Sequence, residues 1–268
     1  MIFYQQEKKE PIRVRFLKAL ERYLFISTLT RYAYIPEFEQ TKLLDFAVQF
    51  RKGEISSDKL VKDIEEFVDT FICKKENLEQ IISDMKSAGF YRWLGLKYFL
   101  YEYELSLKKR TKTYREKLNW EQFTENGLLE GEDKRDYYTI EHIYPQKPKK
   151  PCWTEKFKHY TERERRLLRN SLGNLVPLSE RKNQSFENEC FDYKKGDANT
   201  MVGYKYGSYS ENQIANYDEW TAKEILEQGF KMVDFWEKRW NFNLGSKKDK
   251  AKFLHIEFVA EKENIPLE

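Results

Sequence analysis

The sequence predicts a mainly α-helical protein in which an N-terminal helical bundle precedes a small α+β module. Apolar residues recur at helical spacing through most of the first 108 residues. Further along, a short apolar run over residues 172–178 is followed by a turn and by a polar segment that is compatible with a helix. Helical spacing then returns in the tail. This order of patterns predicts one small strand-containing module among helices.

Amphipathic helices are expected in three segments of the first half: RVRFLKALERYLFISTL, QTKLLDFAVQF and SDKLVKDIEEFVDTFICK. In the third segment, Leu60 and Ile64 fall on one face, and Ser57 and Asp58 stand where a helix cap is expected. Gly53 is placed to end the second helix. These segments form the predicted N-terminal bundle.

The segment GFYRWLGLKYFLYEYELSLKKR carries an unusually wide apolar face. One stripe consists of Trp93, Leu96, Leu100, Tyr103 and Leu107, and beside it stand Leu94, Tyr98, Tyr101 and Leu105. A helix with such a face belongs inside a bundle. We therefore interpret its aromatic residues as core rather than as a platform for stacking bases.

Helical periodicity is lost between residues 118 and 138, where ENG and EGED are typical of turns. We place a helical domain at residues 1–130, a second domain at 131–245 and a C-terminal extension at 246–268. Thr221 and Glu224 match a capping box at the start of a late helix. The stretch KAKFLHIEFVA, which includes His255, alternates enough to predict a final strand.

Composition limits the class of protein. Of the 268 residues, 40% are hydrophobic and 35% are charged, which predicts a packed core under a highly charged surface. No apolar run is long enough to span a bilayer, and the N-terminus lacks the pattern of a signal peptide, so we expect a cytoplasmic protein without a membrane partner. Cys73, Cys152 and Cys190 stand far apart, which predicts reduced thiols used in packing.

The net charge of +3 says little about partners, but the distribution of charge says more. Residues 147–169 contain nine Lys or Arg against three Glu, and residues 108–117 contain six against one. Such patches can neutralise phosphates. Either run could equally be an ordinary solvated face.

The segment TIEHIYPQKPKK holds His142, one of only three histidines. Hydrolysis of a phosphodiester needs a base that works near neutral pH and a cation that stabilises charge on the phosphate, and histidine is the natural base. Glu141 and Asn183 offer oxygen atoms, the ligands that Mg²⁺ prefers. Asn174, in the GNL turn, could tie the loop that orients the histidine.

Two of these motifs, EHIYPQ and LGNLVPLSERKN, resemble the HNH, or ββα-metal, nuclease fold. Together with FENECFDYKK, YGSYSE and RW, the pattern is similar to the C-terminal nuclease domain of GmrSD-type modification-dependent restriction enzymes, over roughly residues 135–245. The resemblance implies that residues 131–245 form a metal-dependent endonuclease module. It also implies that the substrate is DNA and that the role is restriction of foreign DNA, modified DNA included.

The resemblance implies a role for each matching residue. His142 becomes the general base that activates water, and Asn174 the asparagine that fixes the loop. Glu141, where many HNH nucleases have Asp, and Asn183 become ligands of one Mg²⁺ or Mn²⁺ ion. Asn188 is a weaker candidate for a phosphate contact. The expected nucleic-acid contacts are Lys147, Lys149, Lys150, Arg181 and Lys195.

The resemblance also bears on partners. GmrSD-type enzymes join this nuclease to an N-terminal nucleotide-hydrolysing domain with a D-G-Q-Q-R-like motif, and neither DGQ nor a phosphate-binding loop motif occurs in this sequence. A separate nucleotide-hydrolysing subunit is therefore an expected partner besides DNA. One HNH site cuts one strand at a time, so double-strand cleavage would take a homodimer or two sequential events. Two alternatives remain at the level of sequence: a non-catalytic DNA-binding or scaffold subunit with an HNH fold, and an RNA-cleaving toxin that uses the same residues.

Overall fold

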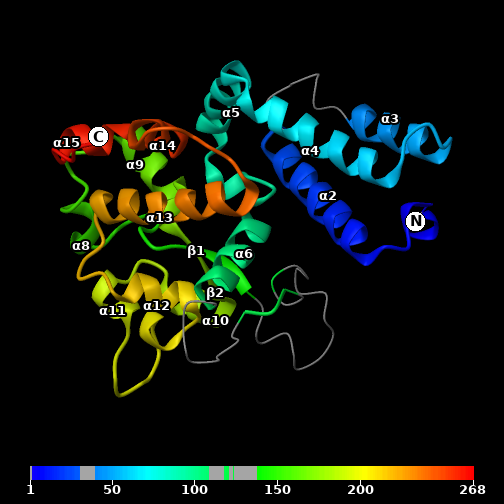
Figure 1. Ribbon diagram of the computed structural model, residues 1–268. Coiled ribbons are helices and arrows are strands. Elements are labelled where there is room, and N and C mark those ends of the chain that lie inside the picture. The colour runs from blue at the N-terminus through cyan, green and yellow to red at the C-terminus, as the bar shows by residue number, and fades with distance from the viewer. Residues whose placement is uncertain (1, 31–39, 109–117, 121–122, 124–137) are drawn as a thin grey trace. The chain divides into compact units, whose positions relative to one another are not determined.

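The computed structural model describes residues 2–30, 40–108, 118–120, 123 and 138–268 (Figure 1). The chain forms two compact units. Unit 1 comprises Met1–Ala88 and Trp93–Gly95, and unit 2 comprises Gly89–Arg92 and Leu96–Glu268. The basic run at residues 109–117 and most of the expected boundary at 118–138 lie outside the described residues.

Unit 1 is a helical bundle, as the sequence predicted. Its helices are α1 (Ile2–Gln6), α2 (Glu10–Thr30), α3 (Gln40–Arg51), α4 (Ser57–Cys73) and α5 (Lys75–Ala88). Helix α4 packs against α2, α3 and α5, and it buries Val61, Ile64 and Val68. The expected cap of α4 was one residue off, because Ser56 is the N-cap and its side chain accepts a hydrogen bond from Lys59 N.

Unit 2 begins with the 3₁₀ turn η2 (Phe90–Arg92) and helix α6 (Leu96–Lys108). The predicted apolar stripe of α6 is buried, but Leu94 is 54% exposed because it precedes the first turn of the helix. Helix α6 packs against α12 (Tyr209–Ala215). Packing thus groups α6 with the second unit, whereas the sequence analysis assigned it to the helical domain.

The only sheet among the described residues is a pair of antiparallel strands, β1 (Tyr138–His142) and β2 (Leu175–Ser179). In their register His142 is opposite Leu175 and Ile140 is opposite Pro177. Each strand of a two-stranded sheet has a free edge, which is why β2 tolerates a proline. The run from residue 172 was predicted to be strand, but Leu172–Asn174 form the 3₁₀ turn η4 before β2 begins.

Helix α10 (Glu180–Phe186) follows β2 directly and packs on both strands, so the predicted helix after the strand is confirmed, but no turn separates the two. The remaining elements of unit 2 are α8 (Pro151–Thr154), α9 (Glu162–Asn170), α11 (Phe191–Lys195), η5 (Tyr204–Tyr206), α13 (Ala222–Trp240), α14 (Lys247–Phe253) and α15 (Glu257–Lys262). In the described part of the chain, no helix combines the length and the apolar character needed to cross a bilayer.

Helix α13 is the central helix of unit 2. It packs against η4, α14 and α15, and Figure 1 shows α14 beside it. The predicted capping box of Thr221 and Glu224 is present at its start. Trp220, Trp236 and Trp240 are fully buried, which confirms that they belong to the core.

The predicted C-terminal strand is wrong. Residues 247–262 form α14 and α15, and His255 lies buried in the connection between them with a φ of +61°. A capping box of Ser246 and Asp249 starts α14. Since Phe253, Leu254 and Ile256 are all buried, the apolar residues here do not alternate between a buried and an exposed face.

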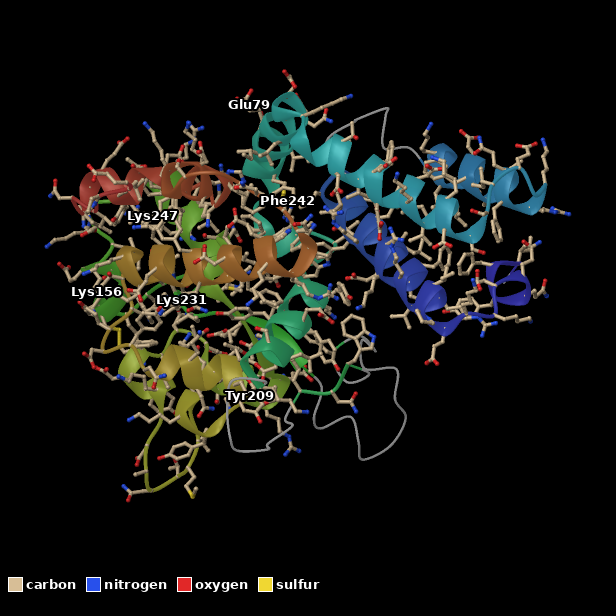
Figure 2. The ribbon with its side chains drawn as sticks, in the orientation of Figure 1. Glu79, Lys156, Tyr209, Lys231, Phe242 and Lys247 are labelled. Atoms are coloured by element: carbon tan, nitrogen blue, oxygen red, sulfur yellow. A yellow bond between two sulfur atoms is a disulfide. The ribbon has the colours of Figure 1, made fainter. Side chains whose placement is uncertain are left out.

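The prediction of reduced cysteines is also wrong for two of the three. Cys152 in α8 and Cys190 before α11 form a disulfide across a sequence separation of 38 residues. Lys156, labelled in Figure 2, lines a small cavity together with both cysteines. Spacing rules detect cysteines that are close in sequence, whereas this pair is brought together by the fold. The Trp153 indole N–H, which bonds the carbonyl of Glu189, ties together the same two segments.

Loss of this disulfide should lower the stability of unit 2. Replacing both Cys152 and Cys190 by Ala releases the loop between them, and chain entropy alone predicts a loss of about 2–4 kcal/mol in the free energy of unfolding. Urea unfolding of the double variant, beside the wild type with and without dithiothreitol, measures the loss. Dithiothreitol should destabilise the wild type but not the double variant. Equal midpoints for all of them would contradict the prediction.

Candidate functional site

A pocket of about 380 Å³ lies at the end of β1. It brings together residues from β1, from the loop that follows it, from α10 and from the turn before α6. The lining residues are Tyr91, Ile140, Glu141, His142, Pro145, Gln146, Lys147, Asn183, Glu187 and Asn188. Three of the residues that the sequence singled out for chemistry, Glu141, His142 and Asn183, therefore share one pocket.

His142 is the last residue of β1 and is 5% exposed. The amide Nε2 of Gln146 lies 3.3 Å from both ring nitrogens, and the ring of Tyr91 lies 4.3 Å from the imidazole, centroid to centroid. Burial lowers the pKa of His142 to about 4, while a hydrogen bond with the Asn170 side chain acts in the opposite direction. At neutral pH the ring is therefore unprotonated and able to accept a proton.

The turn that carries Tyr91 is held close to the histidine by a glycine. Gly89 has a φ of +65°, and a Cβ at this position would lie 2.7 Å from the Cβ of Asn170. Both the backbone conformation and the close approach require glycine. Gly89 thus lets this turn pack against the end of α9, next to the residue that bonds His142.

Asn174 lies outside the pocket lining and is fully buried beneath the loop that follows His142. Its Oδ1 accepts hydrogen bonds from Tyr144 N at 2.8 Å and from Trp220 Nε1 at 3.0 Å. Its Nδ2 donates to the carbonyl oxygens of Tyr144 and Arg169, each at 3.0 Å. The backbone carbonyl of Asn174 also accepts from Ile143 N at 3.1 Å. One amide side chain thus fixes the course of the chain directly after the histidine.

Glu141 is buried and forms an ion pair with Lys194 of α11. The Lys194 Nζ lies 2.5 Å from Glu141 Oε1 and also donates to the carbonyl of Ile143 at 3.2 Å. Burial raises the pKa of Glu141 and lowers the pKa of Lys194, and their attraction opposes both shifts. Sequence reasoning did not identify this lysine, because it stands 53 residues from Glu141.

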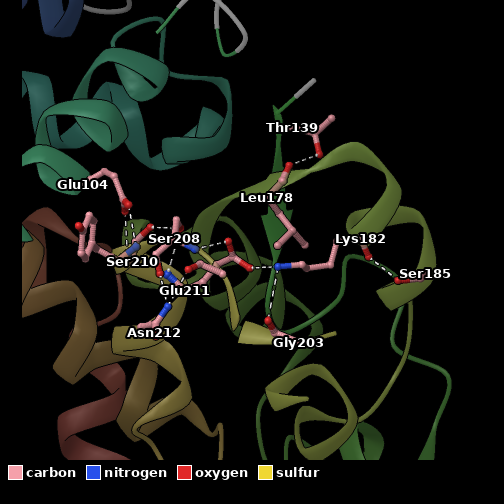
Figure 3. A network of polar contacts seen from close by, with 12 residues as sticks. Glu104, Thr139, Leu178, Lys182, Ser185, Gly203, Ser208, Ser210, Glu211 and Asn212 are labelled. Atoms are coloured by element: carbon pink, nitrogen blue, oxygen red, sulfur yellow. Dashed lines mark hydrogen bonds and ion pairs between the residues drawn. The ribbon is translucent and has the colours of Figure 1, made fainter. Parts of the chain in front are cut away.

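Asn183 points its amide toward the sheet, where its Nδ2 donates to Thr139 Oγ1 at 2.7 Å. This bond uses one of the two N–H donors, and the amide oxygen, which carries the lone pairs, is the atom that could bind a cation. The neighbouring residue Lys182 is 2.5 Å from Glu211 Oε1 of α12, and Glu211 is almost fully buried. Figure 3 shows how this pair ties α10 to α12.

The same network continues to α6 (Figure 3). Glu211 also forms a capping box with Ser208 at the start of α12, and the carboxylate of Glu104 in α6 accepts hydrogen bonds from the backbone N–H groups of Tyr209 and Ser210, both at 2.7 Å. Glu104 itself is buried. The network therefore links α6, α12 and α10, the helix that presents Asn183 to the pocket.

Glu104→Ala should destabilise unit 2, because two backbone N–H groups, one buried and one part-buried, lose their acceptor. The expected loss is about 2–4 kcal/mol in the free energy of unfolding, at roughly 1–2 kcal/mol for each unsatisfied donor. Chemical unfolding measures it. Glu102→Ala is the matched control, since Glu102 lies on the same helix and pairs with Arg239 near the surface, where an ion pair contributes little. Equal losses for the two variants would contradict the prediction.

The donor set of the pocket suits a hard cation held by few protein ligands. The described residues contain no cluster of three or more His, Cys, Asp or Glu that could hold a metal. Glu141 and Asn183 nevertheless supply a carboxylate and an amide oxygen, and Mg²⁺ commonly takes one or two such ligands with water and phosphate. These residues therefore fit the expected ion, although Lys194 already offsets the charge of Glu141.

The expected nucleic-acid contacts are scattered over the surface. Lys147 lines the pocket and is exposed, Lys149 is exposed, and Arg181 is exposed on α10. Lys150 pairs with Glu189. Lys195 donates to the carbonyl of Tyr217 and does not line the pocket.

Much of the basic run at residues 147–169 forms ion pairs with neighbouring carboxylates. The pairs are Lys156 with Glu219, Lys158 with Glu155, and both Arg165 and Arg169 with Glu162. This part of the run is an ordinary charged surface. Of the basic side chains in this run, Lys147 is the one that lines the pocket.

Comparison with known proteins places these observations in a family. A family model described as the C-terminal domain of GmrSD restriction endonucleases matches residues 76–235. Searches of curated proteins and of solved structures returned no match. The matched region starts before α6, which packs with unit 2, and it contains the whole pocket. Because it covers more than half of the chain, the protein belongs to the family of GmrSD restriction endonuclease C-terminal domains.

Proposed function

We propose that the chain is a metal-dependent endonuclease of the HNH type that hydrolyses DNA phosphodiester bonds in restriction of foreign DNA. The observation that carries the proposal is the meeting of Glu141, His142 and Asn183 in one pocket. They come from the end of β1 and from α10, in the order strand, strand, helix. A family of restriction endonucleases supports the assignment to defence.

His142 is the proposed general base. Its ring is neutral at neutral pH and lies against Gln146 and Tyr91, so it can take a proton from a water molecule that attacks the phosphate. Asn174 acts on the loop and not on the substrate, because its side chain is buried against Tyr144 and Trp220. Gln146 and Asn170 orient the ring.

Glu141 and Asn183 are the proposed ligands of one Mg²⁺ or Mn²⁺ ion. A bound divalent ion would stabilise the charge on the phosphate and on the leaving oxygen. Exposed Lys147, Lys149 and Arg181 would contact the DNA backbone. Asn188 lines the same pocket and is within the region that would receive the phosphate.

Cleavage of supercoiled plasmid by the purified chain tests the proposal. Nicking should require Mg²⁺ or Mn²⁺ and stop with EDTA, and DNA ligase should reseal the nicks because hydrolysis leaves a 5′-phosphate and a 3′-hydroxyl. Cleavage that survives EDTA would contradict the proposal. Metal-dependent cleavage of RNA with no cleavage of DNA would instead support the toxin, and salt-sensitive binding without cleavage would support the scaffold.

The same assay tests the proposed partners. If a separate nucleotide-hydrolysing subunit is required, cleavage should appear only when that subunit and a nucleoside triphosphate are added. If the chain works as a homodimer, double-strand breaks should increase more steeply than nicks as protein concentration rises. The two requirements are independent of each other.

A further inference from the structure

Lys194 is a buried charged residue beside the pocket. The proposed reaction gives it no role. Its side chain has no exposed surface, and its ammonium lies 5.9 Å from the centre of the Trp153 ring. Its hydrogen bonds go to the Glu141 carboxylate and to the Ile143 carbonyl. Lys194 therefore holds the two residues that flank His142 in the sequence.

A buried ion pair of this kind is a weak way to stabilise a fold, because removing both charges from water costs about as much as their attraction returns. Two apolar residues of similar volume would pack in the same place without that cost. The adjacent Lys195 shows how a lysine is ordinarily placed: it is only half-buried, and its ammonium bonds a backbone carbonyl instead of a buried carboxylate. The position of the Lys194 charge points to a function at the pocket wall.

We propose that Lys194 sets the charge of the site, so that a divalent cation binds weakly to the free protein and tightly only together with a DNA phosphate. This inference rests on the proposed function. With Lys194 paired to it, Glu141 contributes no net negative charge, and Asn183 is neutral. Glu187 and Lys147, which also line the pocket, carry opposite charges. A second negative group is then needed before a dication is held firmly, and the scissile phosphate supplies it.

The proposal assigns Lys194 the role of a positioning residue rather than a catalytic one. Its ammonium fixes one oxygen of Glu141 and leaves the carboxylate as a wall of the pocket. It also repels a dication that approaches in the absence of phosphate. Metal loading and DNA binding are thereby coupled, and the coupling must be reciprocal.

Binding of Mn²⁺ to the purified chain, followed by electron paramagnetic resonance, tests the proposal without any measurement of activity. In the wild type, a non-cleavable phosphorothioate duplex should raise the Mn²⁺ affinity by about tenfold or more. Without DNA, Lys194→Met should bind Mn²⁺ about tenfold or more tightly than the wild type, since the repelling charge is gone. Lys195→Met, the same change one residue away, should leave the Mn²⁺ affinity of the DNA-free protein unchanged.

Equal Mn²⁺ affinities of the wild type with and without duplex would overturn the proposal, whether or not Lys194→Met folds. Equal DNA-free affinities of wild type and a folded Lys194→Met variant would overturn it as well. If plasmid cleavage still depends on metal in either of these two outcomes, the proposed role of Lys194 is wrong and the proposed metal-dependent nuclease activity stands. Absence of Mn²⁺ binding even with duplex would overturn both this inference and the proposed metal dependence.

Discussion

His142→Ala should abolish most DNA cleavage while leaving the protein folded. Removing a general base typically lowers the rate about 10²- to 10⁴-fold, and no other described histidine lies in the pocket. The imidazole contacts Tyr91 and Gln146 of the pocket and also bonds the Asn170 side chain, so urea unfolding of the variant should accompany the assay to show that it is folded. Single-turnover cleavage of a plasmid or duplex measures the rate.

His159→Ala is the matched control for this experiment. His159 is an exposed histidine in the basic run and contacts Glu263 far from the pocket lining. Its replacement should leave the cleavage rate unchanged. If His142→Ala cleaves as fast as wild type, then His142 is not the base. The pocket would then have to act in binding alone.

Asn174→Ala should lower both stability and activity. The change removes the acceptor of two buried donors, Tyr144 N and Trp220 Nε1, and the donor to two carbonyls, those of Tyr144 and Arg169. At about 1–3 kcal/mol for each buried donor left unsatisfied, we expect a loss of roughly 3–5 kcal/mol in the free energy of unfolding. Urea denaturation measures this loss, and cleavage below the unfolding range measures the effect on activity.

Asn199→Ala is the control for Asn174, because Asn199 is an exposed asparagine in the turn after α11. It should change stability by less than about 0.5 kcal/mol. Asn174→Asp separates the loss of the accepted hydrogen bonds from the loss of the donated ones. It keeps an acceptor for Tyr144 N but loses the NH₂ group. A stable, fully active Asn174→Ala variant would show that the loop after His142 does not need this anchor.

Local sequence was sufficient for the helices and for the order of elements around the site. Helix α4 and helix α13 followed from apolar spacing and capping residues, because both signals act within a few residues of the chain. Helix α10 followed for the same reason. Residues with a proposed chemical role in EHIYPQ and GNL could be named because each motif is short and contiguous.

Alternation alone misled at the C-terminus. KAKFLHIEFVA contains apolar residues at uneven intervals, and a strand and two short helices can both accommodate it. The tertiary structure decided for helices because Phe253, Leu254 and Ile256 are all buried in unit 2. Burial on more than one side removes the contrast between faces on which periodicity depends.

What the sequence determined by itself was the chemical inventory of the site: a histidine, a carboxylate and two asparagines in motifs of fixed spacing. What only the tertiary structure decided was their charged and bonded surroundings. Lys194, Tyr91 and the partner of Cys152 each stand dozens of residues from the group they contact. Such contacts depend on how helices and strands pack, and packing leaves no periodic trace in the order of residues.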